Sequence, residues 1–360
     1  MTNQEIYRIE QLPVFQNRMF STQKDALNCA KGDIILVQDS ETGLIYNQTF
    51  QSDLIQYDTN YQNEQALSPF FKNHLEQVCS IIQTHSKNSR LIEVGCGKGY
   101  FLEFLQKKGL KIKGFDPIYE GNNPNIEKKY FTSETSNISA DIIILRHVLE
   151  HVVKPLDFLD TLRKANCNRG KIYIEVPCLD WISARHAWFD IFYEHVNYFR
   201  LTDFTRMFSH IHEAGHIFDG QYLYIVADLA SLKRPKHNDF EPFTLPANFL
   251  GSINLFSQKI KQLKETQRFS AIWGGASKGV IFSLLMARSG ENIDLVIDIN
   301  PAKQGLYLPA TGLQVQPPQF VSEQLAPGSE IFLMNKNYLN EVQQLTANQF
   351  NFTTVDHDII

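Results

Sequence analysis

The sequence predicts an α/β protein with a central doubly wound domain and a second, C-terminal α/β domain. Two glycine-rich turns support this prediction, because each follows a short apolar run and precedes a helical pattern. The apolar runs are nearly continuous, which is typical of parallel strands that are buried on both faces. We therefore divide the chain as follows: a small N-terminal region of strands and loops (1–67), a central domain (68–232), a linker rich in proline and charge (233–246) and a C-terminal Rossmann-like domain (247–360).

The N-terminal region is expected to contain short strands at 33–38 and 43–46 and a loop at 57–64. Ser68 and Pro69 then open a helix, since serine is a good N-cap and proline suits the first helical position. Apolar residues continue this helix at helical spacing as far as Ile82.

The central domain begins with a strand from Leu91 that runs into the first glycine turn, followed by a helix at 100–108. The next strand, 111–115, ends on Asp116, and later strands are expected at 141–145, 170–177 and 222–228. An acid-tipped second strand within this alternation of strands and helices is the order found in class I S-adenosylmethionine-dependent methyltransferases.

The first glycine turn has the pattern E-x-G-x-G-x-G rather than G-x-G-x-x-G, which favours S-adenosylmethionine over a dinucleotide. S-adenosylmethionine has no pyrophosphate to cradle, and Asp116 could accept hydrogen bonds from two ribose hydroxyls. The alternative is a turn whose glycines serve only positive φ angles. The expected cofactor contacts are Glu93, Gly95, Cys96, Gly97, Gly99, Tyr100, Phe101, Asp116, Pro117, Arg146 and His147.

The C-terminal domain repeats the same plan, with a helix at 247–267 and a strand from Ala271 that leads into the second glycine turn. A helix at 280–288 and strands at 293–298 and 331–334 follow. This domain is either a second nucleotide-binding unit or a packing domain that merely shares the fold.

Composition limits the partners and the location of the protein. A net charge of −5 gives no basic footprint for nucleic acid, and no apolar run approaches the ~18 residues of a membrane span. The N-terminus lacks the apolar segment of a signal peptide, and the five cysteines stand singly. We therefore expect a cytoplasmic protein that binds neither nucleic acid nor membrane, and a homodimer stays open.

Several motifs together resemble the sugar C-methyltransferases of deoxysugar pathways, over nearly the whole chain. They are Gly95 to Gly99, Leu149 to Val152, Tyr193 to His195 with Tyr198 and Phe199, Trp273 to Gly279, Asp298 to Gly305 and Leu308 to Gly312. The resemblance implies a methyltransferase that acts on a nucleotide-linked deoxy or keto sugar, at carbon. It also implies that the C-terminal domain holds the nucleotide end of this substrate.

The chain departs from that family at two places. Members usually carry a cysteine-rich zinc module at the N-terminus, but the cysteines are absent here, so we expect no metal. Many members have Tyr-His-Glu-His where this chain has Phe192, Tyr193, Glu194 and His195. The tyrosine is displaced by one residue, which leaves open whether Tyr193 replaces it.

Methylation at carbon requires a base that removes a proton beside a ketone and a donor for the developing enolate. His195 is the expected base, because the ordinary pKa of histidine lies near working pH. Glu194 is expected to orient it or to act as a second acid or base, and His151 to donate to the enolate or hold a hydroxyl. Tyr61 and Tyr193 are weaker candidates for hydroxyl contacts.

Alternative interpretations stay open at this stage. Glu194 and His195 could form a surface pair, and the i, i+4 spacing of His147 and His151 on a helix suits a metal, although no third ligand is obvious. The expected diphosphate anchors are Gly275, Ser277, Lys278 and Lys303, whose lysines could instead be solvated. O- or N-methylation, a binding protein with a vestigial loop and an oxidoreductase are the competing functions.

Overall fold

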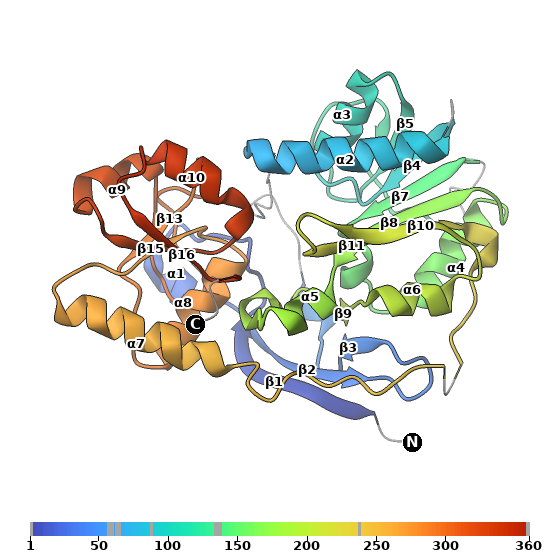
Figure 1. Ribbon diagram of the computed structural model, residues 1–360. Coiled ribbons are helices and arrows are strands. Elements are labelled where there is room, and N and C mark those ends of the chain that lie inside the picture. Colours follow the sequence, from blue (N-terminus) through green and yellow to red (C-terminus); the bar gives the residue numbers. More distant parts are fainter. Residues whose placement is uncertain are drawn as a thin grey trace.

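The computed structural model describes residues 3–55, 61, 66–86, 89–132, 139–236 and 239–357. Within this part of the chain three sheets follow one another, with four strands at the N-terminus, seven in the middle and five at the C-terminus. Figure 1 shows the N-terminal strands beneath the central sheet and the C-terminal unit at one side of both. The mixed α/β fold predicted from the sequence is confirmed. Apart from Tyr61, most of the predicted loop 57–64 lies outside the described residues.

The seven-stranded sheet has the order β10-β11-β8-β7-β4-β5-β6. Its strands are β4 (Arg90–Val94), β5 (Lys111–Phe115), β6 (Ile126–Glu127), β7 (Ile142–Arg146), β8 (Lys171–Pro177), β10 (Ile211–Ile217) and β11 (Tyr222–Asp228). All are parallel except β11, which pairs antiparallel with both β8 and β10. Strand β4 pairs in parallel with β5 on one side and β7 on the other, so the order in which strands are added to the sheet reverses at β4. Ligands of open α/β sheets bind at such a switch point.

Within the described part of the central unit, five α-helices accompany this sheet. They are α2 (Pro69–Ser86), α3 (Tyr100–Lys107), α4 (Pro155–Ala165), α5 (Leu179–Ala184) and α6 (Leu201–Met207). Helix α2 begins at Pro69 as predicted, and its apolar side chains are buried at helical spacing, including Phe71, Leu75, Val78 and Ile82. The strands predicted from Leu91 to Asp228 all form, with ends shifted by one residue or less.

The N-terminal sheet is completed by a strand from the central unit. Its strands are β1 (Gln4–Pro13), β2 (Lys31–Gln38), β3 (Ile45–Asn47) and β9 (Asn197–Tyr198), and helix α1 (Gln23–Leu27) lies between β1 and β2. Ile45 pairs with Tyr198 in an antiparallel ladder. Because β9 begins two residues after His195, this pairing fixes the segment that carries Glu194 and His195.

The C-terminal sheet is parallel throughout and has the order β14-β13-β12-β15-β16. Its strands are β12 (Ala271–Trp273), β13 (Leu295–Ile297), β14 (Val315–Gln316), β15 (Glu330–Leu333) and β16 (Asn351–Thr354), and its helices are α7 (Gly251–Glu265), α8 (Lys278–Arg288), α9 (Pro318–Gln324) and α10 (Leu339–Leu345). Strand β12 comes first in the sequence of this sheet and pairs with β13 on one side and β15 on the other. The order of strands therefore reverses at β12, which places a second switch point at its carboxyl end. Helix α7 begins four residues later than predicted.

The central and C-terminal units share packed aromatic side chains. Trp188 stacks on Phe282 of α8 with ring centroids 5.8 Å apart and an interplanar angle of 11°. Both rings are fully buried, and Phe282 also contacts Phe256 of α7. Separating the two units would therefore expose a large apolar area to water.

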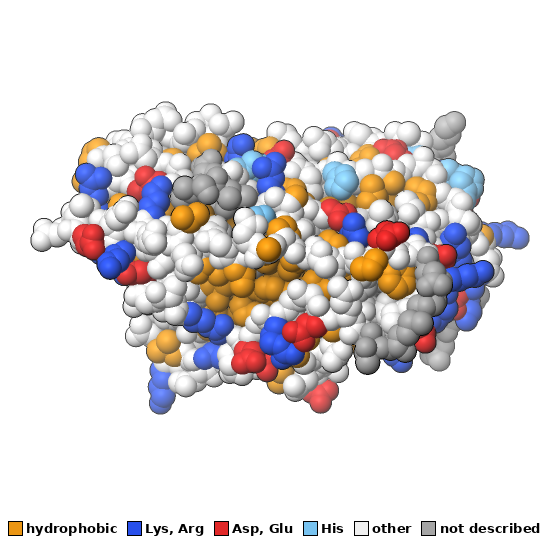
Figure 2. Space-filling view, turned by 60° about the horizontal axis from the view of Figure 1, so that its bottom comes forward, with side chains coloured by type: hydrophobic (Ala, Val, Ile, Leu, Met, Phe, Trp, Pro, Cys, Tyr) orange, Lys and Arg blue, Asp and Glu red, His pale blue; other side chains and the backbone are white. Residues whose placement is uncertain are grey.

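Two features of the surface bear on partners. On the face shown in Figure 2, lysine and arginine side chains stand among aspartate and glutamate, without a continuous basic stripe. Among the described residues, every helix is too short or too polar to span a lipid bilayer.

Candidate active site

The first glycine turn connects β4 to α3 and requires glycine at several positions. Gly95, Gly97 and Gly99 all have positive φ angles, of 74°, 54° and 81°. A Cβ atom at Gly95 would lie 2.5 Å from Cγ2 of Val148, whereas a Cβ at Gly97 would meet no described atom within 4 Å. The turn is therefore packed against protein at Gly95 and opens into free space at Gly97, where a ligand can approach the backbone.

Asp116 is fixed beside this turn at the end of β5. Its Oδ2 accepts a hydrogen bond from Gly97 N at 2.8 Å, and its Oδ1 accepts one from Ile118 N at 2.9 Å. Burial raises the pKa of Asp116, while the two backbone donors act in the opposite direction. Each oxygen keeps a second lone pair, so the carboxylate is oriented without being saturated.

A cavity of about 400 Å³ lies between the central and C-terminal units. The first glycine turn contributes Glu93, Gly95, Cys96, Gly97, Tyr100 and Phe101 to its wall, together with Arg146 and His147 from the end of β7. The second glycine turn contributes Gly274, Ala276, Ser277 and Lys278. Gly99, Asp116 and Pro117, which were also expected to contact the cofactor, are not among the residues that line the cavity. Both glycine turns therefore face one cavity, at the carboxyl ends of parallel strands in the two sheets.

The site suits S-adenosylmethionine on three observations. Gly97 leaves the space that a Cβ would fill, Asp116 is held ready for hydroxyl groups, and Glu93 Oε2 is buried without a hydrogen-bond partner among the described residues. Burial raises the pKa of Glu93 to about 7, although nearby Arg146 lowers it. A buried acceptor of this kind is stabilised when a ligand supplies the missing donor or cation.

A network of buried ionic side chains holds two residues of the cavity wall, Arg146 and His147, in place. Glu175 on β8 is fully buried and contacts Arg146 Nη2 at 3.2 Å, His147 Nε2 at 3.1 Å and His74 Nε2 at 3.0 Å. Burial alone would raise the pKa of Glu175, but these partners hold it well below its usual value. The Arg146 guanidinium lies 4.4 Å from the ring centroid of Phe101 and so fixes the start of α3.

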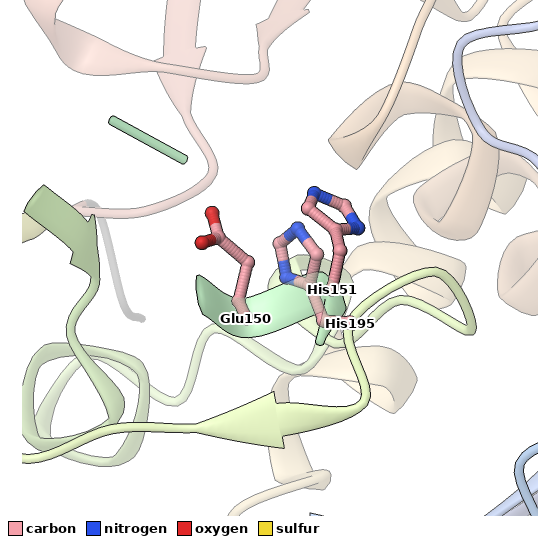
Figure 3. A group of neighbouring side chains, drawn as sticks. All are labelled: Glu150, His151 and His195. Atoms are coloured by element: carbon pink, nitrogen blue, oxygen red, sulfur yellow. The ribbon is translucent and has the colours of Figure 1, made fainter. Parts of the chain in front are cut away.

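Three side chains of the cavity wall form a cluster that includes two of the predicted catalytic residues (Figure 3). Glu150 and His151 come from a short 3-10 helix, η3 (Leu149–His151), and His195 from the segment before β9. One ligand atom of each residue lies within 4.8 Å of the others. The two imidazole centroids are 5.0 Å apart and the rings meet edge to face.

The charges in this cluster are set by burial. Glu150 is 1% exposed, and both of its oxygens lack hydrogen-bond partners among the described residues, although His147 Nδ1 lies 3.4 Å from Oε1. Burial opposes ionisation of Glu150, but His147, His151 and His195 lower its pKa. Burial and His151 lower the pKa of His195 to about 3, so this imidazole is neutral near pH 7 and is a weaker base than an ordinary histidine.

The structure changes the orienting role expected of Glu194, while its side chain lines the cavity and its role as a second acid or base stays a prediction. Its side chain is turned toward the N-terminal segment, where Oε1 accepts a hydrogen bond from Gln16 N at 2.9 Å. Its carbonyl oxygen instead accepts from His151 Nδ1, at 2.9 Å. Glu194 therefore orients His151 rather than His195. Glu194 is 3% exposed and His195 is also enclosed, so the two residues are not a surface pair.

The hydroxyl contact to the substrate that the sequence suggested for Tyr193 is not possible where the structure places this residue. The ring is fully buried, stacks on Phe50 at 5.5 Å and fills the space beside Gly32, and its hydroxyl accepts a hydrogen bond from Gln51 N at 2.9 Å. Its position is structural and lies away from the cavity wall. Tyr61 does line the cavity and accepts a weak hydrogen bond from Asn17 Nδ2 at 3.4 Å.

The structure does not support the hypothesis that His147 and His151 bind a metal as neighbours on one helix face. His147 precedes η3 with a φ of 51°, so His147 and His151 do not share a helix face. In the cavity, the cluster that could hold a cation is instead Glu150, His151 and His195, and the described residues include a second such cluster outside the cavity wall, His210, His212 and Asp228. The sequence prediction found no third ligand, because Glu150 gains its position only when η3 packs against the segment of His195.

The second glycine turn uses two of the expected anion donors internally. Gly275 N donates to Asp298 Oδ2 at 3.0 Å, and Ser277 N donates to Gln16 O at 3.2 Å. Gly275 is not among the residues that line the cavity, whereas Ser277 is. The prediction that these two amides are free for a diphosphate is therefore wrong.

The two lysines expected beside this turn are buried, which contradicts the solvated alternative. Lys278 Nζ lies 3.3 Å from Asp190 and 4.0 Å from Asp356, and it donates to Gln221 Oε1 at 2.9 Å. Lys303 Nζ lies 3.5 Å from Asp298. Both line the cavity, but both charges are already paired.

The buried polar residues Glu150, Glu175 and His74 of the central unit were missed by sequence reasoning. A signal existed for Glu175, because a glutamate within an otherwise apolar strand must find a cation when both faces of the sheet are covered. Glu150 stands in the Leu149 to Val152 motif, which carried the resemblance without a role for this residue.

Comparisons with known proteins agree with this geometry over the central unit. Residues 63–215 match the family model of a methyltransferase domain. No curated protein matches the chain significantly.

Several solved structures resemble part of the fold. The plantazolicin methyltransferase BpumL, solved with S-adenosylhomocysteine, is 25% identical over 32% of this chain and 51% of its own, with a TM-score of 0.28. The Burkholderia thailandensis 1,6-didemethyltoxoflavin-N1-methyltransferase is 12% identical over 43% and 77%, with a TM-score of 0.32. An Aquifex aeolicus S-adenosylmethionine-dependent methyltransferase is 14% identical over 42% and 88%, with a TM-score of 0.31.

The family match covers the first glycine turn, the acid-tipped strand β5 and the short helix η3. These are the elements that build the cofactor side of the cavity. The protein is thus a methyltransferase, and its cofactor is S-adenosylmethionine.

Proposed function

We propose that this enzyme methylates a carbon atom of a nucleotide-linked keto sugar, with His195 as the base. One observation supports this most directly: the half-buried His195 lies in the wall of a cavity that is also lined by two glycine turns from two different units. The central unit would hold the methyl donor and the C-terminal unit the nucleotide end of the acceptor. A long, two-ended substrate suits such a cavity.

On the cofactor side, we assign the ribose to Asp116 and the methionine part to the turn from Gly95 to Gly99. Glu93 would meet the donor's ammonium group, because its buried Oε2 lacks a partner among the described residues. Tyr100 and Ile118 expose 40% and 43% of their surfaces beside the turn and could flank the adenine ring. The sequence analysis did not select Ile118. The cofactor supplies an electrophilic methyl carbon beside a sulfonium leaving group.

The chemistry assigned to the protein is proton removal. His195 would take a proton from the carbon beside the ketone, and the electron pair would move to the ketone oxygen to give an enolate. The imidazolium so formed would lie beside the Glu150 carboxylate, which favours the charged form of His195. The enolate carbon would then form a bond to the methyl carbon as the S–CH3 bond breaks, which leaves S-adenosylhomocysteine and restores the ketone, and the proton would leave from His195 to solvent.

His151 is the competing base, and a specific observation favours it. Its Nδ1 hydrogen bond to the Glu194 carbonyl places the proton on Nδ1 and leaves the lone pair of the neutral ring on Nε2. In this tautomer His151 accepts a proton, and it donates to an enolate only when protonated. The two histidines could therefore exchange the roles assigned to them.

The test uses exchange and product analysis together. Nucleotide 4-keto sugars would be incubated in D2O with the enzyme and S-adenosylhomocysteine, and deuterium incorporation would be followed by mass spectrometry. Carbon methylation predicts exchange beside the ketone by the wild type and by His216→Ala, whose histidine is exposed and remote. It predicts little exchange by His195→Ala.

A second mass-spectrometric measurement, with S-adenosylmethionine present, would locate the new methyl group. A methyl group on oxygen or nitrogen, without deuterium exchange, would replace the carbon proposal with heteroatom methylation. Loss of exchange in His151→Ala but not in His195→Ala would exchange the roles of the two histidines.

A further inference from the structure

The second glycine turn repeats the acid-to-turn hydrogen bonds of the first. Asp298, at the end of β13, accepts from Gly275 N through Oδ2 at 3.0 Å and from Asn300 N through Oδ1 at 2.8 Å. Asp116 accepts from Gly97 N through Oδ2 and from Ile118 N, also two residues ahead, through Oδ1. In both units the carboxylate is thus aimed by the same two backbone donors.

Asn300 adds a feature that the first unit lacks. It is 5% exposed and lines the cavity together with Asp298. Its Oδ1 accepts a hydrogen bond from Ala302 N at 3.0 Å, and this bond fixes which end of the amide is the nitrogen. Nδ2 is buried without a hydrogen-bond partner among the described residues. A buried amide donor without a partner is destabilising unless a ligand accepts from it.

The two side chains together select one kind of chemical group. A carboxylate only accepts hydrogen bonds, and the remaining amide N–H of Asn300 only donates. A hydroxyl group satisfies both, because it donates its hydrogen and accepts through its lone pairs. A phosphate fits less well, since it would face the Asp298 carboxylate and since the amides of Gly275 and Ser277 are already used.

We propose that Asp298 and Asn300 bind the 2′- and 3′-hydroxyls of a ribose, so that the acceptor sugar is carried by a ribonucleoside diphosphate. This inference rests on the proposed function for the nucleotide and extends it to the class of nucleoside. The carboxylate accepts from the hydroxyls and the Asn300 amide donates to one of them. Lys303, 3.5 Å from Asp298, balances the charge of the carboxylate.

The test measures binding of nucleotides without any sugar. Calorimetry with saturating S-adenosylhomocysteine would compare ADP, CDP, GDP and UDP with their 2′-deoxy counterparts. At least one ribonucleotide should bind, and its 2′-deoxy form should bind about tenfold more weakly or worse, because a hydrogen bond to a charged group is lost.

Asn300→Asp is the matched variant, since it keeps the Oδ1 acceptor for Ala302 N and removes only the Nδ2 donor. It should weaken ribonucleotide binding about tenfold and leave the affinity for S-adenosylhomocysteine unchanged. Asp116→Ala should weaken the binding of S-adenosylhomocysteine and leave the binding of ribonucleotides unchanged.

The outcomes separate this inference from the proposed function. Equal binding of ribo- and 2′-deoxynucleotides would overturn the ribose site while leaving a nucleotide-linked substrate in place. Unchanged ribonucleotide binding by Asn300→Asp would remove Asn300 from the site and overturn the inference. Failure of every nucleoside diphosphate to bind would overturn both the ribose site and the nucleotide part of the proposed function.

Discussion

The two glycine turns of this protein share one backbone plan but differ in how they are completed. In the central unit the Cβ position at Gly97 is open, and Asp116 has no lysine within ion-pair distance among the described residues. In the C-terminal unit Gly275 is enclosed by Val296, and Asp298 is paired with Lys303. The same strand-turn-helix can therefore present its backbone to a ligand or only the acid of the next strand.

The second glycine turn is held by the N-terminal segment, which links the C-terminal unit to the central one. A Cβ at Gly279 would lie 1.9 Å from Gly274 O, so the second turn is packed tightly against its own helix. Ser277 has a φ of 44° and is held by Gln16 O and Asn17 Oδ1 of the N-terminal segment. Gln16 N in turn donates to Glu194, so one short segment contacts the second turn and a residue of the site.

The largest expected effect is the loss of turnover when His195, in the cavity that both glycine turns line, is replaced. His195→Ala should lower turnover by about 10²- to 10⁴-fold, the usual share of a general base. Affinity for S-adenosylmethionine should stay near normal, because His195 is outside the first turn. Steady-state kinetics and calorimetry would measure both. Full activity of His195→Ala together with inactivity of His151→Ala would assign the base to His151.

The next effect distinguishes Asp116 from Asp298 by the affinity of each variant for S-adenosylmethionine. Asp116→Ala should weaken S-adenosylmethionine binding by roughly 1.5–3 kcal/mol, because charge-assisted hydrogen bonds to hydroxyl groups are lost. Asp298→Ala should leave this affinity unchanged, since Asp298 belongs to the other turn. Calorimetric titration of both variants with the cofactor tests the assignment. An unchanged affinity in Asp116→Ala would contradict the cofactor site.

A smaller effect is expected in the pH dependence of stability. Burial opposes the charged form of His147, but Glu150 and Glu175 raise its pKa to about 9. A raised histidine pKa stabilises the folded state fully below the unfolded value of about 6.5, and this stabilisation is lost as pH rises toward 9. The loss should be about 2 kcal/mol. Urea unfolding at pH 6 and pH 9 would show a smaller pH difference for His147→Gln than for the wild type.

The smallest expected effect is that of metal removal. We expect turnover to survive treatment with a chelator, because a metal on His195 would occupy the lone pair that the proposed base needs. Elemental analysis and activity before and after treatment with EDTA would test this. Metal bound in proportion to the chain, with activity that requires it, would instead make Glu150, His151 and His195 a metal site.

The sequence by itself determined the fold class and the elements that carry the cofactor turn. Residues 91–116 could be interpreted correctly because local rules govern them: apolar runs form buried strands, glycines allow positive φ, and an acid follows the second strand. The shared cavity followed from the same rules, since the carboxyl ends of parallel strands point to one edge of each sheet.

Only the tertiary structure decided which side chains of the motifs reach the cavity. Tyr193 is a neighbour of His195 in sequence, but its ring is turned toward Phe50, whereas Glu194 lines the cavity and accepts a hydrogen bond from Gln16 N. Glu150 and Asn300 gained their importance from burial without a partner, and burial depends on contacts between segments far apart in the chain. The sequence pattern of a turn cannot show which of its amides the fold has already used.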